Sequence, residues 1–295
     1  NKKTIFGWSL YDWAKSAYET TTLGAILPVY FVSVVVPAEG FNFRGNLYTG
    51  AEVWGFAIGS ALFIFFLIMP TIGAIGDLSG NRMKLFKIFA YGGAVFASTF
   101  YFATSGDVIF TLGIYFLAQF GATGSNVFYD SVLKDITTDD TIDTVSARGY
   151  ALGYLGGGLQ LVISLALIQL GPDMLGIETA MASRIAISSA GLWWLIFSIM
   201  SFSRMKITES QPVSIEGSIF ANAYSKNFKT LKKIRKFPFL MYFLIAYLFY
   251  WDGLQTVINM SAAYFTEVLL LDQTQIIIVF IVVQFVAYFG AKLAG

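Results

Sequence analysis

The chain has 295 residues, of which 56% are apolar and only 13% are charged, about half the charged share of an ordinary soluble domain. So few charges cannot cover a water-facing surface, and the composition therefore indicates a membrane protein. The net charge of +1 gives no sign of nucleic-acid binding, and a sequence without cysteine or histidine lacks thiolate chemistry, the commonest metal ligands and the usual catalytic bases.

Eight apolar runs are long enough to cross a bilayer, which takes about 20 mostly apolar residues for about 30 Å of hydrocarbon. The first run begins behind two lysines, but the charged residues Asp12, Lys15 and Glu19 within it are unlike a cleavable signal peptide. The pattern predicts an all-α integral membrane protein. In chain order, the runs are residues 6–36, 52–76, 85–105, 108–133, 147–170, 183–203, 238–266 and 273–294.

The basic residues between these runs predict an orientation. Fifteen of the 19 Lys and Arg lie on one side of the predicted spans, and only Arg44 and Arg184 lie on the other. Because cytoplasmic loops carry the positive excess, the amino terminus is expected in the cytoplasm. If the protein is bacterial, the membrane would be the inner (cell) membrane.

The longest connection predicts a division of the chain. Residues 204–237 separate an amino-terminal six-helix half, 1–203, from the first two helices of a second half, 238–295. Because the chain opens on Asn1 without Met and stops at the end of an apolar run, we expect it to be truncated, with about eight of twelve helices present.

Within the connection, apolar residues recur at near-helical spacing beside basic ones, which predicts an amphipathic helix on the inner membrane face. A solvated basic linker is the alternative, and a site for anionic lipid is a further interpretation, since the positive-inside bias alone also produces such a cluster. The apolar positions are Ile215, Ile219, Ala223, Leu231 and Ile234.

Polar residues in the first run fall on one helical face. Asp12, Lys15 and Glu19 are spaced i, i+3 and i+7, and Ser16 shares their side. Ionisable groups in a span cost at least about 2.5 kcal/mol near its centre, so they need a partner, water or a function. The face either lines a cavity that binds a solute or a proton, or is an internally neutralised cluster that only orients the helix.

The seventh run repeats this spacing with Asp252, Gln255 and Asn259. Asp252 falls near the middle of its run, where its carboxylate cannot easily reach either surface, so we expect it to face an aqueous pathway. The alternative is an interhelical hydrogen bond. Asn126 is an isolated polar residue of the fourth run, a candidate for the same site or for such a bond.

The turn after the second run resembles the signature of the major facilitator superfamily. The pattern G-x-x-x-D-R-x-G-R-R/K is matched by Gly73, Asp77, Gly80 and Arg82, while Leu78 and Asn81 depart from it. The resemblance implies that this turn acts as a cytoplasmic latch between the two halves of the transporter.

Two further stretches resemble the vacuole effluxer-like branch of that superfamily, which includes autophagy-related amino-acid exporters. Residues 7–18 resemble its Y-D-W-A-N-S-A opening and residues 243–256 its Y-N-D-G-x-Q-T run, with Lys15 and Trp251 where Asn is usual. The resemblance implies a twelve-helix major facilitator fold and a secondary active transporter of solutes, with amino acids as the substrate class.

The mechanism that these patterns favour is alternating access, in which the two halves rock about a midplane cavity. A coupling proton or sodium ion is expected, and Asp252 and Glu19 are the candidate proton carriers because the chain has no histidine. The alternatives are a cation-coupled sugar symporter of the same superfamily and a receptor or scaffold without transport. No enzyme activity and no cofactor are expected, because no nucleophile–base pair, metal cluster or phosphate loop is recognised.

Overall fold

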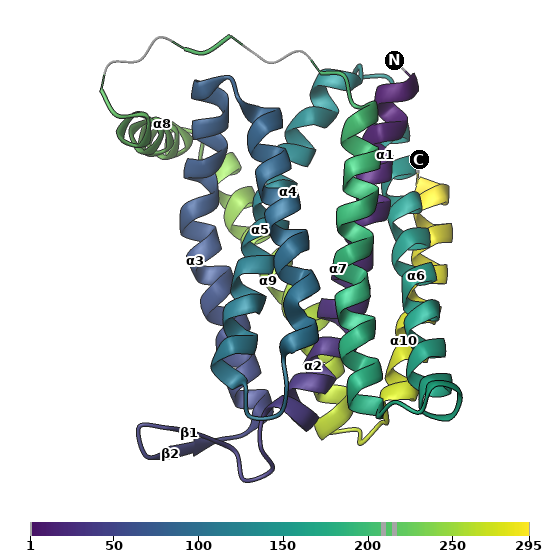
Figure 1. Ribbon diagram of the computed structural model, residues 1–295. Helices are drawn as coiled ribbons and strands as arrows, with labels where there is room; N and C mark the ends of the chain where they lie inside the picture. Colours follow the sequence, from purple (N-terminus) through teal and green to yellow (C-terminus); the bar gives the residue numbers. More distant parts are fainter. Residues whose placement is uncertain (1, 208–210, 214–216, 295) are drawn as a thin grey trace.

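The computed structural model describes residues 2–207, 211–213 and 217–294; Asn1, Ile215 and Gly295 lie outside them. Long helices run side by side and form a single bundle (Figure 1). Seven of the described helices are long and apolar enough to cross a membrane, or eight if the bent pair α8 (Ile219–Ile234) and α9 (Pro238–Glu267) counts as one span. The prediction of an all-α membrane protein with about eight spans is confirmed.

The first span, Lys2–Val35, is the most deeply buried of these spans and changes its winding along its length. It is α-helical in α1 (Lys2–Ala17), π-helical in η1 (Tyr18–Ile26), α-helical in α2 (Leu27–Tyr30) and π-helical again in η2 (Phe31–Val35). The wider π winding, with i→i+5 hydrogen bonds, is rare and often found at functional sites. It begins directly after the Lys15 turn and contains Glu19.

Five further membrane-length elements follow the first span in chain order. Helix α3 begins with a capping box between Thr49 and Glu52 and ends at Gly80, whose φ of 68° is in the left-handed region that glycine favours. The elements are α3 (Gly50–Ser79), α4 (Arg82–Ser98) with its extension η3 (Thr99–Phe102), α5 (Val108–Ile136), α6 (Ile142–Leu175) and α7 (Thr179–Arg204).

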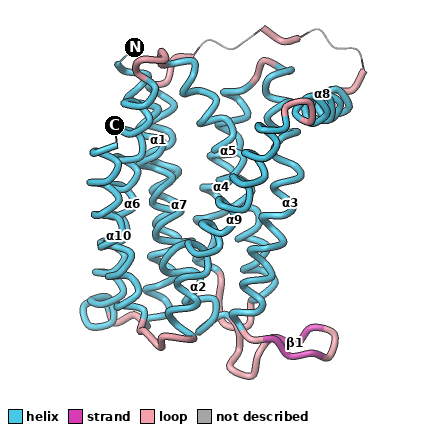
Figure 2. The backbone as a smooth tube through the Cα atoms, turned by 180° about the vertical axis from the view of Figure 1, so that it is seen from behind, coloured by secondary structure: helices cyan, strands magenta, loops and turns pink. Residues whose placement is uncertain are grey.

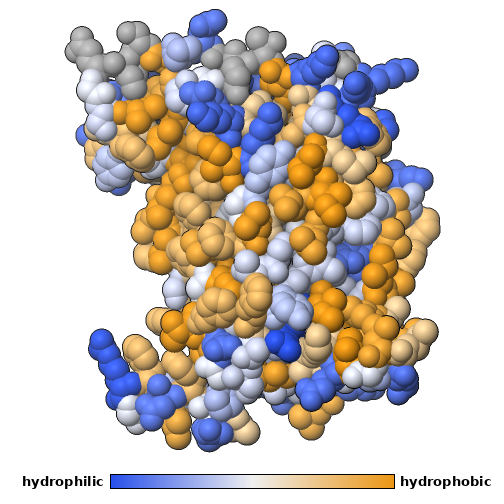
Figure 3. Space-filling model, viewed as in Figure 1, coloured by the Kyte–Doolittle hydropathy of each residue, from blue (hydrophilic) through white to orange (hydrophobic). Residues whose placement is uncertain are grey.

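Helix α1 packs mainly against α6 and α7, and α4 packs against α5 and α7. Glycines of α6 allow the close approach to α1: a Cβ atom on Gly149 would lie 2.6 Å from the Trp8 ring, and one on Gly156 would lie 2.5 Å from the Trp13 carbonyl oxygen. On the face drawn in Figure 3, apolar side chains dominate the middle and charged ones gather at the two ends. This distribution suits a bilayer.

A short β-hairpin, which the sequence analysis did not predict, lies between the first span and α3. Strands β1 (Phe41–Phe43) and β2 (Asn46–Tyr48) pair antiparallel with Phe43 opposite Asn46. The two turn residues, Arg44 and Gly45, have φ values of 52° and 87°, as a type I′ turn requires. The hairpin lies at the end of the bundle opposite the amino terminus (Figure 1).

The last three helices are α8 (Ile219–Ile234), α9 (Pro238–Glu267) and α10 (Gln273–Ala294). Helix α8 lies within the connection for which the sequence predicts an amphipathic helix, and its axis is bent by 113° from that of α9. It lies beside the end of α3, at the same end of the bundle as the amino terminus (Figures 1 and 2). Helix α10 lies along α6.

Candidate functional site

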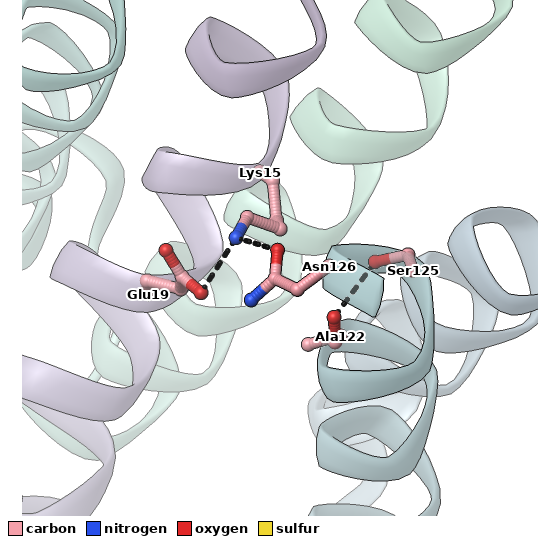
Figure 4. A network of polar contacts seen from close by, with 5 residues as sticks. All are labelled: Lys15, Glu19, Ala122, Ser125 and Asn126. Atoms are coloured by element: carbon pink, nitrogen blue, oxygen red, sulfur yellow. Dashed lines mark hydrogen bonds and ion pairs between the residues drawn. The ribbon is translucent and has the colours of Figure 1, made fainter. Parts of the chain in front are cut away.

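A buried lysine joins the first span to α5. The Lys15 side chain is only 6% exposed, and its Nζ atom lies 2.9 Å from Oε1 of Glu19, one turn further along the same span. The same Nζ donates a hydrogen bond to Oδ1 of Asn126, which projects from α5 (Figure 4). Three residues that the sequence picked out from two separate runs therefore form one cluster, which we call the Lys15 cluster.

The neighbouring Ser125 of α5 does not bond to Lys15. The hydroxyl of Ser125 donates to the carbonyl oxygen of Ala122, 2.7 Å away, and is satisfied within its own helix (Figure 4). Glu19 keeps 40% of its side chain exposed, so the Lys15 cluster is buried on the lysine side and open on the carboxylate side. An opening of this kind is what a charged ligand would need to reach the pair.

Asp12 and Ser16 lie against α6. Asp12 is only 7% exposed. A Cβ atom added to Gly153 would lie 2.7 Å from Oδ2 of Asp12 and 2.7 Å from Oγ of Ser16, so the glycine supplies their space. The four polar residues that the sequence picked out in the first span thus divide: Asp12 and Ser16 face α6, while Lys15 reaches α5 and pairs with Glu19.

Sequence reasoning missed Thr20 as a polar contact of the first span. Nε2 of Gln284, from α10, donates to Oγ1 of Thr20 at 3.1 Å, and Gly157 of α6 makes room for the same oxygen. The run Thr20-Thr21-Thr22 beside Glu19 was the available signal. Gln284 therefore links a helix from the second predicted half to the first span. A similar polar contact joins α6 to α7, where Nε2 of Gln160 donates to Oγ of Ser189 at 2.8 Å.

The polar residues of α9 stand apart from the Lys15 cluster. Asp252 is exposed, and Gln255 and Asn259 are half-buried. The Asn259 amide donates to the Gln255 carbonyl oxygen at 2.8 Å, within the helix. Among the described residues, no hydrogen bond or ion pair joins these three side chains to the first span. That they face the first span across a shared cavity stays a prediction.

The signature turn connects to two other helices. Oδ2 of Asp77 lies 3.1 Å from Nζ of Lys226 on α8, and Nη2 of Arg82 lies 2.8 Å from Oδ2 of Asp135 at the end of α5. Gly80 makes the turn, and a Cβ atom on Gly73 would lie 3.2 Å from the Val127 side chain on α5. The acid and the base of the motif thus bind different partners instead of each other.

The comparisons with known proteins agree with the helical architecture and the motifs. The family described as vacuole effluxer Atg22 like matches residues 134–295. The chain belongs to the vacuole effluxer Atg22-like family. An uncharacterized MFS-type transporter, YxiO of Bacillus subtilis (strain 168), is 31% identical over 281 residues, which are 95% of this chain and 64% of that protein. The predicted membership of the major facilitator superfamily is confirmed.

A more distant relative of this vacuole effluxer-like protein is fungal. Autophagy-related protein 22 of Cryptococcus neoformans var. neoformans serotype D (strain B-3501A) is 29% identical over 156 residues, 52% of this chain and 28% of that protein. The chain thus spans less than two thirds of the length of either relative. No solved structure matches it.

Two pockets of the vacuole effluxer-like bundle follow the seam between α6 and α10. One of about 520 Å³ is lined by Asp143, Tyr150 and Tyr154, and one of about 310 Å³ is lined by Trp13, Tyr154 and Gln284, among others. The second reaches the first span at Trp13. Within the part of the chain that the structure describes, no group of three or more Asp and Glu could hold a metal ion.

Proposed function

We propose that this vacuole effluxer-like protein is a secondary active transporter that moves a small zwitterionic solute, with amino acids as the substrate class, by alternating access. The observation that carries the proposal is the Lys15 cluster, a buried ammonium held by Glu19 and Asn126 from two spans. Buried charge inside a membrane is costly and is retained mainly where it serves a solute or ion pathway.

The chemistry of the Lys15 cluster suits a zwitterion. The Lys15 ammonium would receive the solute carboxylate, while the partly exposed Glu19 carboxylate and the Asn126 amide would receive its ammonium group. The proposed second wall is Asp252, Gln255 and Asn259 of α9, brought opposite by movement of the two halves. A proton or sodium ion would couple through Glu19 or Asp252, and the amino-terminal end of the bundle would face the cytoplasm.

The proposal is tested by transport in liposomes that contain the full protein. Uptake of a labelled amino acid should be driven by a proton or a sodium gradient, and unlabelled amino acids should compete where sugars do not. Asp252→Asn should reduce gradient-driven uptake at least about tenfold, as expected for a coupling carboxylate. Competition by sugars alone would favour the symporter alternative, and solute binding without flux would indicate a receptor.

A further inference from the structure

Helix α8 lies at the edge of the bundle, against α3. It has 16 residues, and the 113° bend that separates its axis from that of α9 falls at residues 235–237. Both views place it beside the end of α3, at the same end as the amino terminus (Figures 1 and 2). Because α9 would enter the membrane directly after the bend, the carboxyl-terminal end of α8 would lie at the level of the bilayer surface.

One side of α8 carries large apolar residues that no described residue covers. They follow the spacing i, i+4, i+8 and i+11, which places them on a single stripe. Ala223 is the one buried side chain of this helix. The exposed stripe consists of Phe220 (66% exposed), Tyr224 (68%), Phe228 (52%) and Leu231 (61%).

The opposite side of α8 is basic. Lys226, Lys229 and Lys233 fall on it at about 100° per residue, and residues 219–236 contain no Asp or Glu. Lys232 marks the boundary, since its ammonium lies 5.0 Å from the centroid of the Phe228 ring. A helix with aromatic residues on one side and lysines on the other is typical of helices that lie in the headgroup region of anionic membranes.

Contacts with α3 fix the position of α8. The Lys226–Asp77 ion pair and a hydrogen bond of 3.4 Å from the Asn227 amide to the Thr71 hydroxyl hold it to α3. Lys229, Lys232 and Lys233 make no ion pair with any described residue. They are therefore free to bind another anion.

We propose that α8 is a binding site for anionic phospholipids, with its apolar stripe inserted between headgroups and acyl chains and Lys229, Lys232 and Lys233 bound to lipid phosphates. Charge complementarity identifies the occupant, because the bilayer surface offers both an apolar layer and phosphate groups at this depth. The proposal does not depend on transport, since it concerns only a helix at the membrane surface.

Fluorescent labels on single cysteines test the proposal, since the 295 residues contain none. Tyr224→Cys and, as the water-facing reference, Asp140→Cys in the exposed loop between α5 and α6 would each carry an environment-sensitive dye in the full protein. The vesicles would contain either phosphatidylcholine alone or about 30% phosphatidylglycerol. Quenching of the Tyr224 label by spin-labelled lipid should be at least about twice as strong as quenching of the Asp140 label in anionic vesicles, and it should weaken in neutral ones.

A charge variant provides the second arm. Lys229→Gln/Lys232→Gln/Lys233→Gln should abolish the response of the Tyr224 label to phosphatidylglycerol, whereas Lys84→Gln/Lys87→Gln on α4 should leave it unchanged. Gel filtration would check that both variants are folded. Equal lipid quenching of the Tyr224 label in both kinds of vesicle would overturn the anionic site. A label shielded from lipid and from aqueous quenchers alike would show that protein covers the stripe and would also overturn it.

Discussion

Gly153 of α6 supplies the space in which Asp12 and Ser16 pack, since a Cβ atom there would lie 2.7 Å from an oxygen of each. Gly153→Ala should therefore destabilise the protein by about 1 to 3 kcal/mol, the usual range for overpacking a close contact. The effect would be measured as a lower melting temperature of the purified protein in detergent. Gly113→Ala on α5 is the matched control because its Cβ would meet nothing within 4 Å. Equal melting of the two variants would contradict the packing account.

Residues on one helical face could be predicted from spacing, but their partners on other helices could not. The i, i+3, i+7 pattern indicated that Asp12, Lys15 and Glu19 share a side, and the Lys15–Glu19 pair follows from it. That Asn126, 111 residues away, would be the second partner of Lys15 depends on how α1 and α5 are rotated against each other. The spacing of polar residues in one sequence does not reveal how two helices are rotated against each other.

The ion pair between α3 and α8 should affect how these two helices are positioned against each other. The side chains of Asp77 and Lys226 are 53% and 47% exposed, so their ion pair is worth about 0 to 1 kcal/mol and mainly fixes position. In a Thr71→Cys/Asn227→Cys background, oxidative cross-linking between the two helices should be efficient, and Asp77→Lys should reduce its yield. The reversed pair Asp77→Lys/Lys226→Asp should restore it. Unchanged cross-linking in Asp77→Lys would mean that the ion pair does not position α8.

At the scale of elements, apolar run length predicted the spanning helices well, and near-helical spacing predicted α8. The β1–β2 hairpin was not predicted, because each strand has only three residues. Its turn also places Arg44 at a positive φ, a conformation that arginine rarely adopts. The π-helical winding of η1 was also missed. We attribute this winding to the packing of the first span between its neighbours, since its residues are almost all buried.

At the scale of the molecule, the first span occupies the interior of the bundle, while α9 and α10 present broad exposed faces. This arrangement puts the charged residues of the first span where only protein or a water-filled pathway can accommodate them. If protein alone surrounds Lys15, the Lys15 cluster is structural. If a water-filled pathway reaches it, the cluster can bind a solute. The pair must be removed together, because removing one partner leaves an uncompensated buried charge.

The most direct measurement is solute counterflow in liposomes that contain the full protein with the neutral double substitution Lys15→Met/Glu19→Gln. The proposed function predicts that this variant keeps its melting temperature within a few degrees, because both charges leave together. It also predicts that the variant loses counterflow of amino acids at least about tenfold, because the groups that would hold the zwitterion are gone. Counterflow at the unmodified rate in a stably folded double variant would contradict the account.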